Sequence, residues 1–325
     1  MDEDFLYVIV PYFNFADYKS GVSNLNRFIT QMSTFRQVRT VLIEGYRENQ
    51  LEDYSNKVFK HIKVKLPSIL WVKENLINIA ITSLPEKWKY VSWIDRDILF
   101  TNTAWVEETI HELKSNDLVQ PWTSCIFLDK DFVPSEVTRE GEAVVFAESF
   151  CSSYPKKVID LDKWYKAAKS TIGNLTTSVW AGHPGQAWAA TRGFYEKLGG
   201  LYDRAIVGGA DSLILIAKLE LKNCCMLTGI ATDVQNYLKH LKEAKISCVK
   251  GLICHYHHGE IKDRGYADRH KMLKEHNYEP RTFLSYTSEG VLTYTAHGTL
   301  LEQSVYNYFK LRKEDGEKYD NKQGY

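Results

Sequence analysis

The front half of the chain alternates continuous apolar runs with segments of helical period, and this alternation restricts the fold more than any other feature. The apolar runs occupy residues 5–14, 38–45, 90–95 and 117–122. Between them, apolar side chains recur three and four residues apart at 19–32, 70–84 and 104–114. Continuous apolar runs are typical of parallel strands that are covered on both faces. The sequence therefore predicts an α/β fold with a doubly wound, mainly parallel sheet flanked by helices.

The second half of the chain is less regular. Residues 122–178 have no clear period, so we expect loops and short elements over one face of the sheet. Further on, the sequence predicts a strand running into a helix at 185–200, a helix at 210–222, a strand at 247–259, and one helix with a loose tail after about residue 280. We expect one main domain at 1–280 and a C-terminal helical extension at 281–325, packed on it or trailing from it.

The overall charge and the cysteines exclude several classes of protein. Lys plus Arg and Asp plus Glu both number 41 in 325 residues, whereas a general nucleic-acid binder has a basic excess. The six cysteines form no C-x-x-C pair, so we expect reduced thiols rather than a zinc knuckle. The N-terminus is acidic with a short apolar run, and no stretch is long enough to span a membrane. We expect a soluble, cytoplasmic protein that binds no nucleic acid.

Two carboxylates, Asp95 and Asp97, follow the predicted strand at 90–95. In an open parallel sheet, ligands bind at the carboxyl ends of the strands. Two carboxylates held there repel each other unless a cation joins them, and oxygen ligands suit Mn²⁺ and Mg²⁺. The alternative is a solvated turn in which Asp95 caps a local bend.

Two later segments carry side chains that suit the same kind of site. Asp211 follows a Gly-Gly pair, which allows a close approach of the backbone to a ligand; the alternative is a helix N-cap. His255, His257 and His258 gather at the end of the predicted strand at 247–259. Metal binding is the interpretation we favour for this cluster, and a surface histidine cluster is the alternative.

Taken in order, these motifs resemble nucleotide-sugar glycosyltransferases of the GT-A fold, in particular the inverting β-1,4-galactosyltransferase type. The matching segments keep the family's order from residue 5 to about residue 275, and they are VIVPYFN, WVKENLINIA, WIDRDILF, GQAWAATRGFYEKLGGLY, VGGAD and HYHHGEIKD. The pairing of WIDRDILFTN with a late HG…R…RH pattern also resembles little-characterised transferases of large DNA viruses and phages. The resemblance implies a GT-A catalytic domain over residues 1–280.

The resemblance implies a metal site. Asp97 would bind Mn²⁺ directly, and Asp95 would support the ribose or the waters of the metal. The family's Met and His ligands, three residues apart, fall on His255 and His258, and the exchange of thioether for imidazole should improve tolerance of Mg²⁺. The alternation of side chains along a strand would instead pair His255 with His257.

The resemblance also implies roles in substrate binding. The residues that would bind the donor, besides Asp95, are Pro11, Tyr12, Asn14, Trp71, Lys73 and Lys262. Either Lys262 or Arg264 would add positive charge at the diphosphate. Asp211 falls on the general base. Trp180, His183 and Trp188, together with Trp122, are candidates for stacking on acceptor sugars, and core aromatic packing is the alternative for each.

Two positions depart from the family. Val207 and Ala210 stand where the family has an acceptor-platform Trp and an acidic residue. We therefore do not expect an N-acetylglucosamine acceptor, and we do not assign the family's galactosyl specificity to this chain.

The expected function is metal-dependent transfer of a hexose from a nucleoside-diphosphate sugar, with UDP favoured, to a saccharide hydroxyl. Asp211 as a base favours inversion at the anomeric carbon. Alternatives are a retaining glycosyltransferase, a nucleotidyltransferase of similar fold, a phosphatase-like hydrolase with an Asp nucleophile, and a sugar- or nucleotide-binding protein without activity. A Gly-rich N-terminal triphosphate loop is absent from the sequence, and a hydrolase would carry its D-x-D on the first strand.

Overall fold

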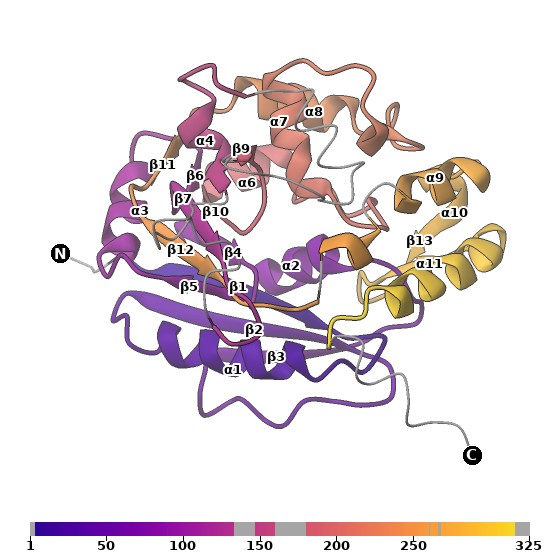
Figure 1. The fold of residues 1–325 in the computed structure, drawn as a ribbon, viewed down its shortest axis with the longest axis horizontal. Coiled ribbons are helices and arrows are strands. Elements are labelled where there is room, and N and C mark those ends of the chain that lie inside the picture. Colours follow the sequence, from indigo (N-terminus) through magenta and orange to yellow (C-terminus); the bar gives the residue numbers. More distant parts are fainter. Residues whose placement is uncertain (1–3, 133–146, 160–179, 260, 266–267, 316–325) are drawn as a thin grey trace.

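The computed structural model describes residues 4–132, 147–159, 180–259, 261–265 and 268–315 (Figure 1). Its centre is a seven-stranded sheet in which β1 lies parallel to β2 and β4, and β10 lies antiparallel to β4 and β6. In spatial order the strands are β11 (Ile246–Cys248), β6 (Leu118–Gln120), β10 (Ala187–Thr191), β4 (Tyr90–Ile94), β1 (Leu6–Phe13), β2 (Val38–Tyr46) and β3 (Lys60–Lys65). The predicted mixed, mainly parallel sheet is confirmed.

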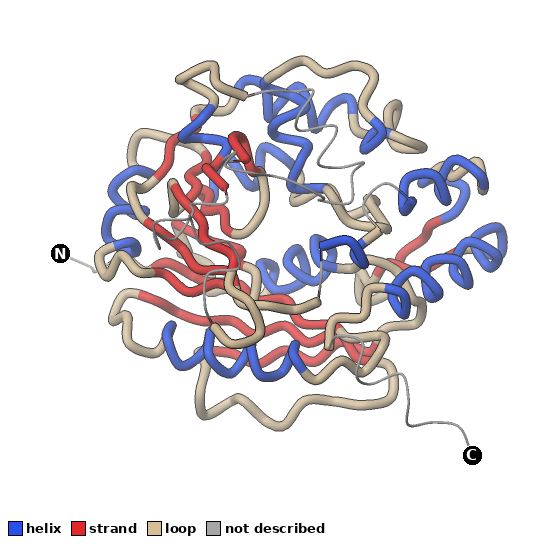
Figure 2. The backbone as a smooth tube through the Cα atoms, in the orientation of Figure 1, coloured by secondary structure: helices blue, strands red, loops and turns tan. Residues whose placement is uncertain are grey.

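Helices cover both faces of this sheet (Figure 2). Successive side chains of β1 point to opposite faces, so Val8 and Val10 pack in one core and Ile9 in the other. The first core contains α1 (Ser20–Met32) and α3 (Trp105–Leu113), and the second contains α2 (Lys73–Thr82), α6 (Arg192–Leu198), α7 (Leu213–Lys218) and α8 (Gln235–Glu243). The continuous apolar run of β1 is explained by this burial on both faces.

A second sheet, of five strands, carries part of the candidate site. In spatial order its strands are β5 (Ile98–Phe100), β12 (Leu252–His255), β7 (Ser124–Phe127), β8 (Ala147–Ser149) and β9 (Trp180–His183). The single strand predicted at 247–259 is wrong, because the chain leaves the first sheet after β11 and enters the second at β12. Gly251 lies at this crossing, where a Cβ atom would lie only 3.1 Å from the Cβ of Asn102.

Other predicted elements are shorter or were missed. The helix predicted at 210–222 is a 3₁₀ turn, η1 (Ala210–Ser212), followed by α7, and the positive φ of Glu220 (53°) lies just beyond its end. β3 was missed because its alternating charged residues lack an apolar run. The region predicted as loops and short elements, 122–178, contains β7, β8 and α4 (Phe150–Ser153), and β9 follows it. Residues 133–146 and 160–179 lie outside the described part.

The chain after residue 260 has more structure than the sequence predicted. It forms η3 (Ile261–Arg264), α9 (Asp268–Glu275), α10 (Pro280–Phe283), a hairpin of β13 (Leu284–Tyr286) and β14 (Leu292–Tyr294), η4 (Ala296–Gly298) and the predicted helix, α11 (Thr299–Leu311). The apolar side chains of the hairpin and of α11 belong to the same core as α2. The division of the chain at residue 280 stays a prediction.

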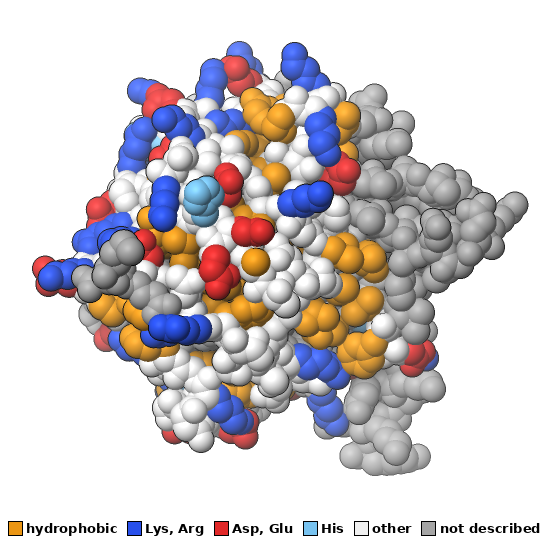
Figure 3. All heavy atoms as spheres, turned by 90° about the vertical axis from the view of Figure 1, so that its left-hand side faces the viewer, with side chains coloured by type: hydrophobic (Ala, Val, Ile, Leu, Met, Phe, Trp, Pro, Cys, Tyr) orange, Lys and Arg blue, Asp and Glu red, His pale blue; other side chains and the backbone are white. Residues whose placement is uncertain are grey.

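The surface carries no dominant charge on the face that Figure 3 shows, where basic and acidic side chains are interspersed. This agrees with the formal net charge of zero. Among the described residues, no helix combines the length and the apolar character that a membrane span requires.

Candidate active site

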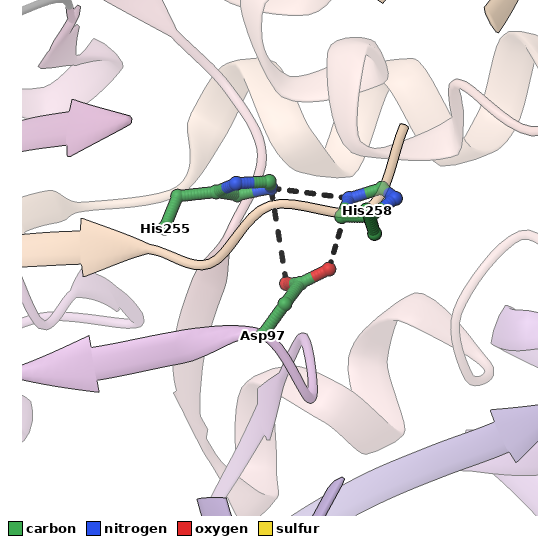
Figure 4. Close-up of side chains that lie close together, drawn as sticks. All are labelled: Asp97, His255 and His258. Atoms are coloured by element: carbon green, nitrogen blue, oxygen red, sulfur yellow. Dashed lines mark hydrogen bonds and ion pairs between the residues drawn. The ribbon is translucent and has the colours of Figure 1, made fainter. Parts of the chain in front are cut away.

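Asp97, His255 and His258 form a buried cluster in which each side chain faces the other two (Figure 4). The Nε2 atom of His258 lies 3.0 Å from Oδ2 of Asp97, and Nε2 of His255 lies 3.9 Å from Oδ1. The two Nε2 atoms are 3.3 Å apart. One carboxylate and two imidazoles thus point their ligand atoms at a common centre.

Strand pairing builds this cluster. β12 runs antiparallel to β5, so His255 lies opposite Ile98, and the backbone N–H of Tyr256 donates to the carbonyl of Asp97 (2.8 Å). β12 ends at His255, so the alternation of side chains that would have paired His255 with His257 does not continue. His258 completes the group instead, in the loop that follows.

The donor set fits a divalent cation. Burial lowers the pKa of both imidazoles, to about 3 for His255, so both are neutral near pH 7. Burial alone would raise the pKa of Asp97, but the facing imidazoles and Arg96 hold it well below its ordinary range. Oδ1 of Asp97 is buried and accepts no hydrogen bond from the described residues. An ionised carboxylate with a free oxygen and two neutral imidazoles is the protonation state that metal binding requires.

Asp95 has a different partner from Asp97. Its Oδ1 accepts a hydrogen bond from the Nζ atom of Lys73, at the first residue of α2, and the pair is largely buried. Burial raises the pKa of Asp95 and outweighs the effect of Lys73. Burial opposes the charge on Lys73, yet the pKa of Lys73 is raised because Asp95, Glu74 and Asp211 favour its charged form. Asp95 is therefore held by an ammonium group, and its charge still acts on Asp97.

Asp211 lies near this ion pair. It sits in η1 directly after Gly208 and Gly209, whose φ angles of 82° and 97° favour glycine. The cap position of η1 is Gly209, and no side chain makes a capping hydrogen bond there, so helix capping does not explain Asp211. A Cβ atom on Gly185 would lie 2.7 Å from Oδ2 of Asp211, which shows how closely the 185 turn approaches this carboxylate.

A mainly apolar pocket adjoins Asp211 and Lys73. Aromatic rings line much of it, from Trp93 and Trp188 of the sheet, Tyr202 of the loop after α6, and Tyr237 of α8. Trp188 is buried, and its Nε1 donates to the carbonyl of Pro184 (2.6 Å), so this indole also holds the turn before β10. The Glu74 carboxyl lies on the pocket wall, and burial raises its pKa to about 8, so it is protonated at neutral pH.

His183, the last residue of β9, also lies close to Gly185. A Cβ atom on Gly185 would lie 3.0 Å from Cε1 of His183, whose Nδ1 accepts a hydrogen bond from the Gly185 N–H (3.1 Å). Its ring meets Trp122 edge to face. Burial lowers the pKa of His183 to about 4, so the imidazole is neutral.

Four of the residues predicted to bind the donor lie at the end of β1 and in the turn before α2. Asn14 bonds the backbone of Tyr18 at both N (3.0 Å) and O (2.8 Å), so it fixes the turn after β1. Trp71 stacks on Phe309 of α11 with a centroid distance of 6.3 Å, and its buried Nε1 has no hydrogen-bond partner among the described residues. Pro11 and Tyr12 are buried in β1.

Two predicted residues have no described side chain. Trp180 begins β9, and Lys262 lies in η3, and only their backbone is placed. Beside Lys262, the buried Arg264 lowers the pKa of His183, His255 and His258 through its charge. A positive charge therefore faces the candidate metal cluster from this segment.

One group near the cluster was missed from the sequence. Glu314, in the segment predicted as a loose tail, lies beside His258 and Arg96. Nothing in its local sequence indicates this, because only the packing of α11 brings it there.

No family model and no curated protein matches the sequence. Three solved structures show the range of similar folds. The catalytic domain of Drosophila β-1,4-galactosyltransferase 7 with xylobiose matches at 10% identity and a TM-score of 0.33, over 66% of this chain and 60% of that one. Glucosyl-3-phosphoglycerate synthase of Mycobacterium tuberculosis, with Mg²⁺ and UDP, matches at 10% identity and a TM-score of 0.38, over 90% of this chain and 87% of that one. The 4-diphosphocytidyl-2C-methyl-D-erythritol synthase of Anaerococcus prevotii matches at 12% identity and a TM-score of 0.35, over 77% of this chain and 88% of that one.

The chain thus spans about three fifths of the Drosophila structure, which is of the galactosyltransferase type that the sequence motifs resemble. At TM-scores below 0.5 these similarities do not define a function, and the residues of the site must do so.

Proposed function

We propose that this protein is a metal-dependent glycosyltransferase that moves a hexose from a UDP-sugar to a saccharide hydroxyl, with inversion at the anomeric carbon. The observation that carries the proposal is the buried cluster of Asp97, His255 and His258, with Asp95, Lys73 and Asp211 close by. A structural ion-pair network would not leave a buried carboxylate oxygen without a hydrogen bond between two neutral imidazoles.

Asp97, His255 and His258 would hold Mn²⁺, or Mg²⁺ in its place. The bound cation would supply positive charge to the leaving diphosphate. Arg264 is a buried cation whose charge acts on this cluster, and it would bind phosphate oxygens. Lys73 would hold Asp95 in place beside the ribose. The nucleoside would lie between the end of β1, at Pro11, Tyr12 and Asn14, and the indole of Trp71.

Asp211 would act as the general base. The acceptor hydroxyl oxygen attacks the anomeric carbon, its proton passes to Asp211, and the bond from that carbon to the diphosphate oxygen breaks with its electron pair leaving on the UDP. The small neighbour Gly185 leaves room at this carboxylate. His183, Trp188 and Trp180 are the residues we propose for acceptor binding.

A screen of nucleotide sugars tests this proposal. UDP release is measured with each donor, with and without Mn²⁺ and a panel of mono- and disaccharide acceptors. We expect one UDP-hexose to give Mn²⁺-dependent UDP release that an acceptor accelerates, and a glycosylated product of inverted configuration by NMR. Asp97→Asn should lose the activity, and Asp131→Asn, on an exposed residue, should keep it.

Three results would overturn the proposal. Pyrophosphate release from a nucleoside triphosphate and a sugar phosphate would identify a nucleotidyltransferase. Hydrolysis of simple phosphate esters would identify a hydrolase. Binding of Mn²⁺ and UDP without turnover of any donor would identify a binding protein.

A further inference from the structure

The segment that follows α11, residues 312–315, crosses the candidate metal cluster, and we term it the C-terminal strap. We propose that Glu314 in this strap is a positioning residue that orients His258 as a metal ligand. The inference rests on the metal site of the proposed function but on no part of the transfer reaction.

Glu314 faces the ring nitrogen of His258 that points away from the cluster. Nε2 of His258 faces Asp97 and His255, whereas Nδ1 lies 4.0 Å from Oε2 of Glu314. Nδ1 is buried and makes no hydrogen bond within the described part of the chain. A carboxylate on that side favours the tautomer with its proton on Nδ1, which leaves the lone pair of Nε2 for a metal. Metal-bound imidazoles commonly donate their second ring N–H to such a carboxylate partner, which fixes the tautomer and the orientation of the ring.

The charge of Glu314 is held in place by two arginines. Its Oε1 accepts from Nε of Arg312 (2.7 Å), and its Oε2 lies 3.5 Å from a terminal nitrogen of Arg96. The carboxylate is nearly fully buried, and the two guanidinium groups fix the position of both of its oxygens beside His258.

The strap is fixed at both ends. Asp315 accepts hydrogen bonds from the backbone N–H groups of Lys19 (2.7 Å) and Ser20 (2.8 Å), at the start of α1. The hydroxyl of Tyr18 accepts from the N–H of Lys313 (2.9 Å). These contacts connect the strap to the turn that follows β1, far from it in the sequence.

The loop that carries His258 is shaped to receive the strap. Gly259 has a φ angle of 81°, and a Cβ atom there would lie 2.9 Å from both Cα of Glu314 and the carbonyl oxygen of Lys313. A side chain at 259 would therefore push Glu314 away from His258. Arg312 also lies over the ring of Trp71, at 5.6 Å from its centroid, so the strap meets the proposed nucleoside site as well.

Mn²⁺ binding to the full-length protein, without any nucleotide, tests the role of Glu314. Free Mn²⁺ is followed by electron paramagnetic resonance during titration. We expect Glu314→Gln to weaken Mn²⁺ binding about tenfold, because outer-shell partners of metal-bound imidazoles have effects of this size. The matched control is Glu289→Gln, on an exposed residue of the β13–β14 turn, which should bind Mn²⁺ like the wild type.

A double-mutant cycle separates positioning from a general structural effect. In a His258→Ala background, Glu314→Gln should cause little further loss of Mn²⁺ affinity, because the residue it orients is gone. Asp315→Asn, which loosens the strap without altering the cluster, should weaken Mn²⁺ binding less than Glu314→Gln does. Equal losses from Glu314→Gln in both backgrounds, or wild-type binding by Glu314→Gln, would overturn the inference. If the variants change Mn²⁺ affinity as expected but the protein transfers no sugar, the proposed function is wrong and the role of Glu314 is still supported.

Discussion

At the scale of single residues, the two carboxylates of the D-x-D motif face different charges. Asp97 faces two neutral imidazoles and keeps a buried oxygen without a hydrogen bond, whereas Asp95 is paired with Lys73. The ammonium group of Lys73 already balances the charge of Asp95, so a metal ion is attracted more strongly to the carboxylate of Asp97. This division supports Asp97 as the direct metal ligand of the proposed enzyme.

Asp211 gives a prediction that separates chemistry from binding. Asp211→Asn removes the proposed proton acceptor and keeps the shape of the side chain. Transfer to the acceptor should fall by a factor of about 10² to 10⁴, while Mn²⁺ and UDP affinity stay within twofold. Single-turnover transfer and calorimetric UDP titration measure the two effects. Near-normal transfer by this variant would remove Asp211 as the base.

His270, in α9, gives a prediction about pH and stability. Burial and the neighbouring Arg269 lower its pKa from 6.5 to about 3 in the folded protein. Between pH 6.5 and about 3 the unfolded chain binds a proton at this residue that the folded chain does not bind. The free energy of unfolding should therefore fall as the pH falls through this range, by up to about 1.4 kcal/mol per pH unit from this residue.

His270→Gln tests that contribution. Glutamine can still accept the hydrogen bond from Nε of Arg269, which His270 accepts at 3.4 Å. Urea unfolding between pH 4 and 7 should show a shallower pH dependence in the variant than in the wild type. Parallel curves for the two proteins would contradict the prediction.

At the scale of elements, the turn after β12 gives a prediction with a matched control. Gly259 and Gly290 both have positive φ, at 81° and 77°, but only Gly259 has the strap against it. Gly290→Ala should cost about 1 kcal/mol from backbone strain alone and leave Mn²⁺ binding unchanged. Gly259→Ala should destabilise the fold more and also weaken Mn²⁺ binding. Unfolding and Mn²⁺ titrations measure both, and equal effects of the two variants would contradict the close packing of the strap.

At the scale of the whole molecule, α11 offers a test of how the C-terminal extension contributes to the core. Leu301 is fully buried in the core that contains α2, whereas its neighbour Leu300 is 77% exposed. Leu301→Ala should lower the free energy of unfolding by about 2–5 kcal/mol, and Leu300→Ala by less than about 0.5 kcal/mol. Urea unfolding of the two variants and the wild type measures these free energies. Small effects of both changes would mean that the extension does not stabilise this core.

Most strands of the seven-stranded sheet and most of the helices that cover it could be predicted from the sequence, because each of them buries a regular apolar pattern. β1 and α1 are examples, since their apolar positions follow the period of a strand covered on both faces and of an amphipathic helix. β3 and the β13–β14 hairpin could not be predicted in this way, because their short segments lack such a pattern and form against strands or turns already in place.

For the site, residue types and their spacing predicted the chemical groups: a carboxylate pair, a glycine pair before an aspartate, and a histidine cluster. Which of these groups contact one another depends on the packing of distant elements. The end of β12 at His255 brings His258 to Asp97, Lys73 takes Asp95, and the packing of α11 places Glu314 behind His258. The physical reason is that residue types and local periods are properties of neighbouring positions, whereas the partner of a buried charge is set by which distant elements pack together.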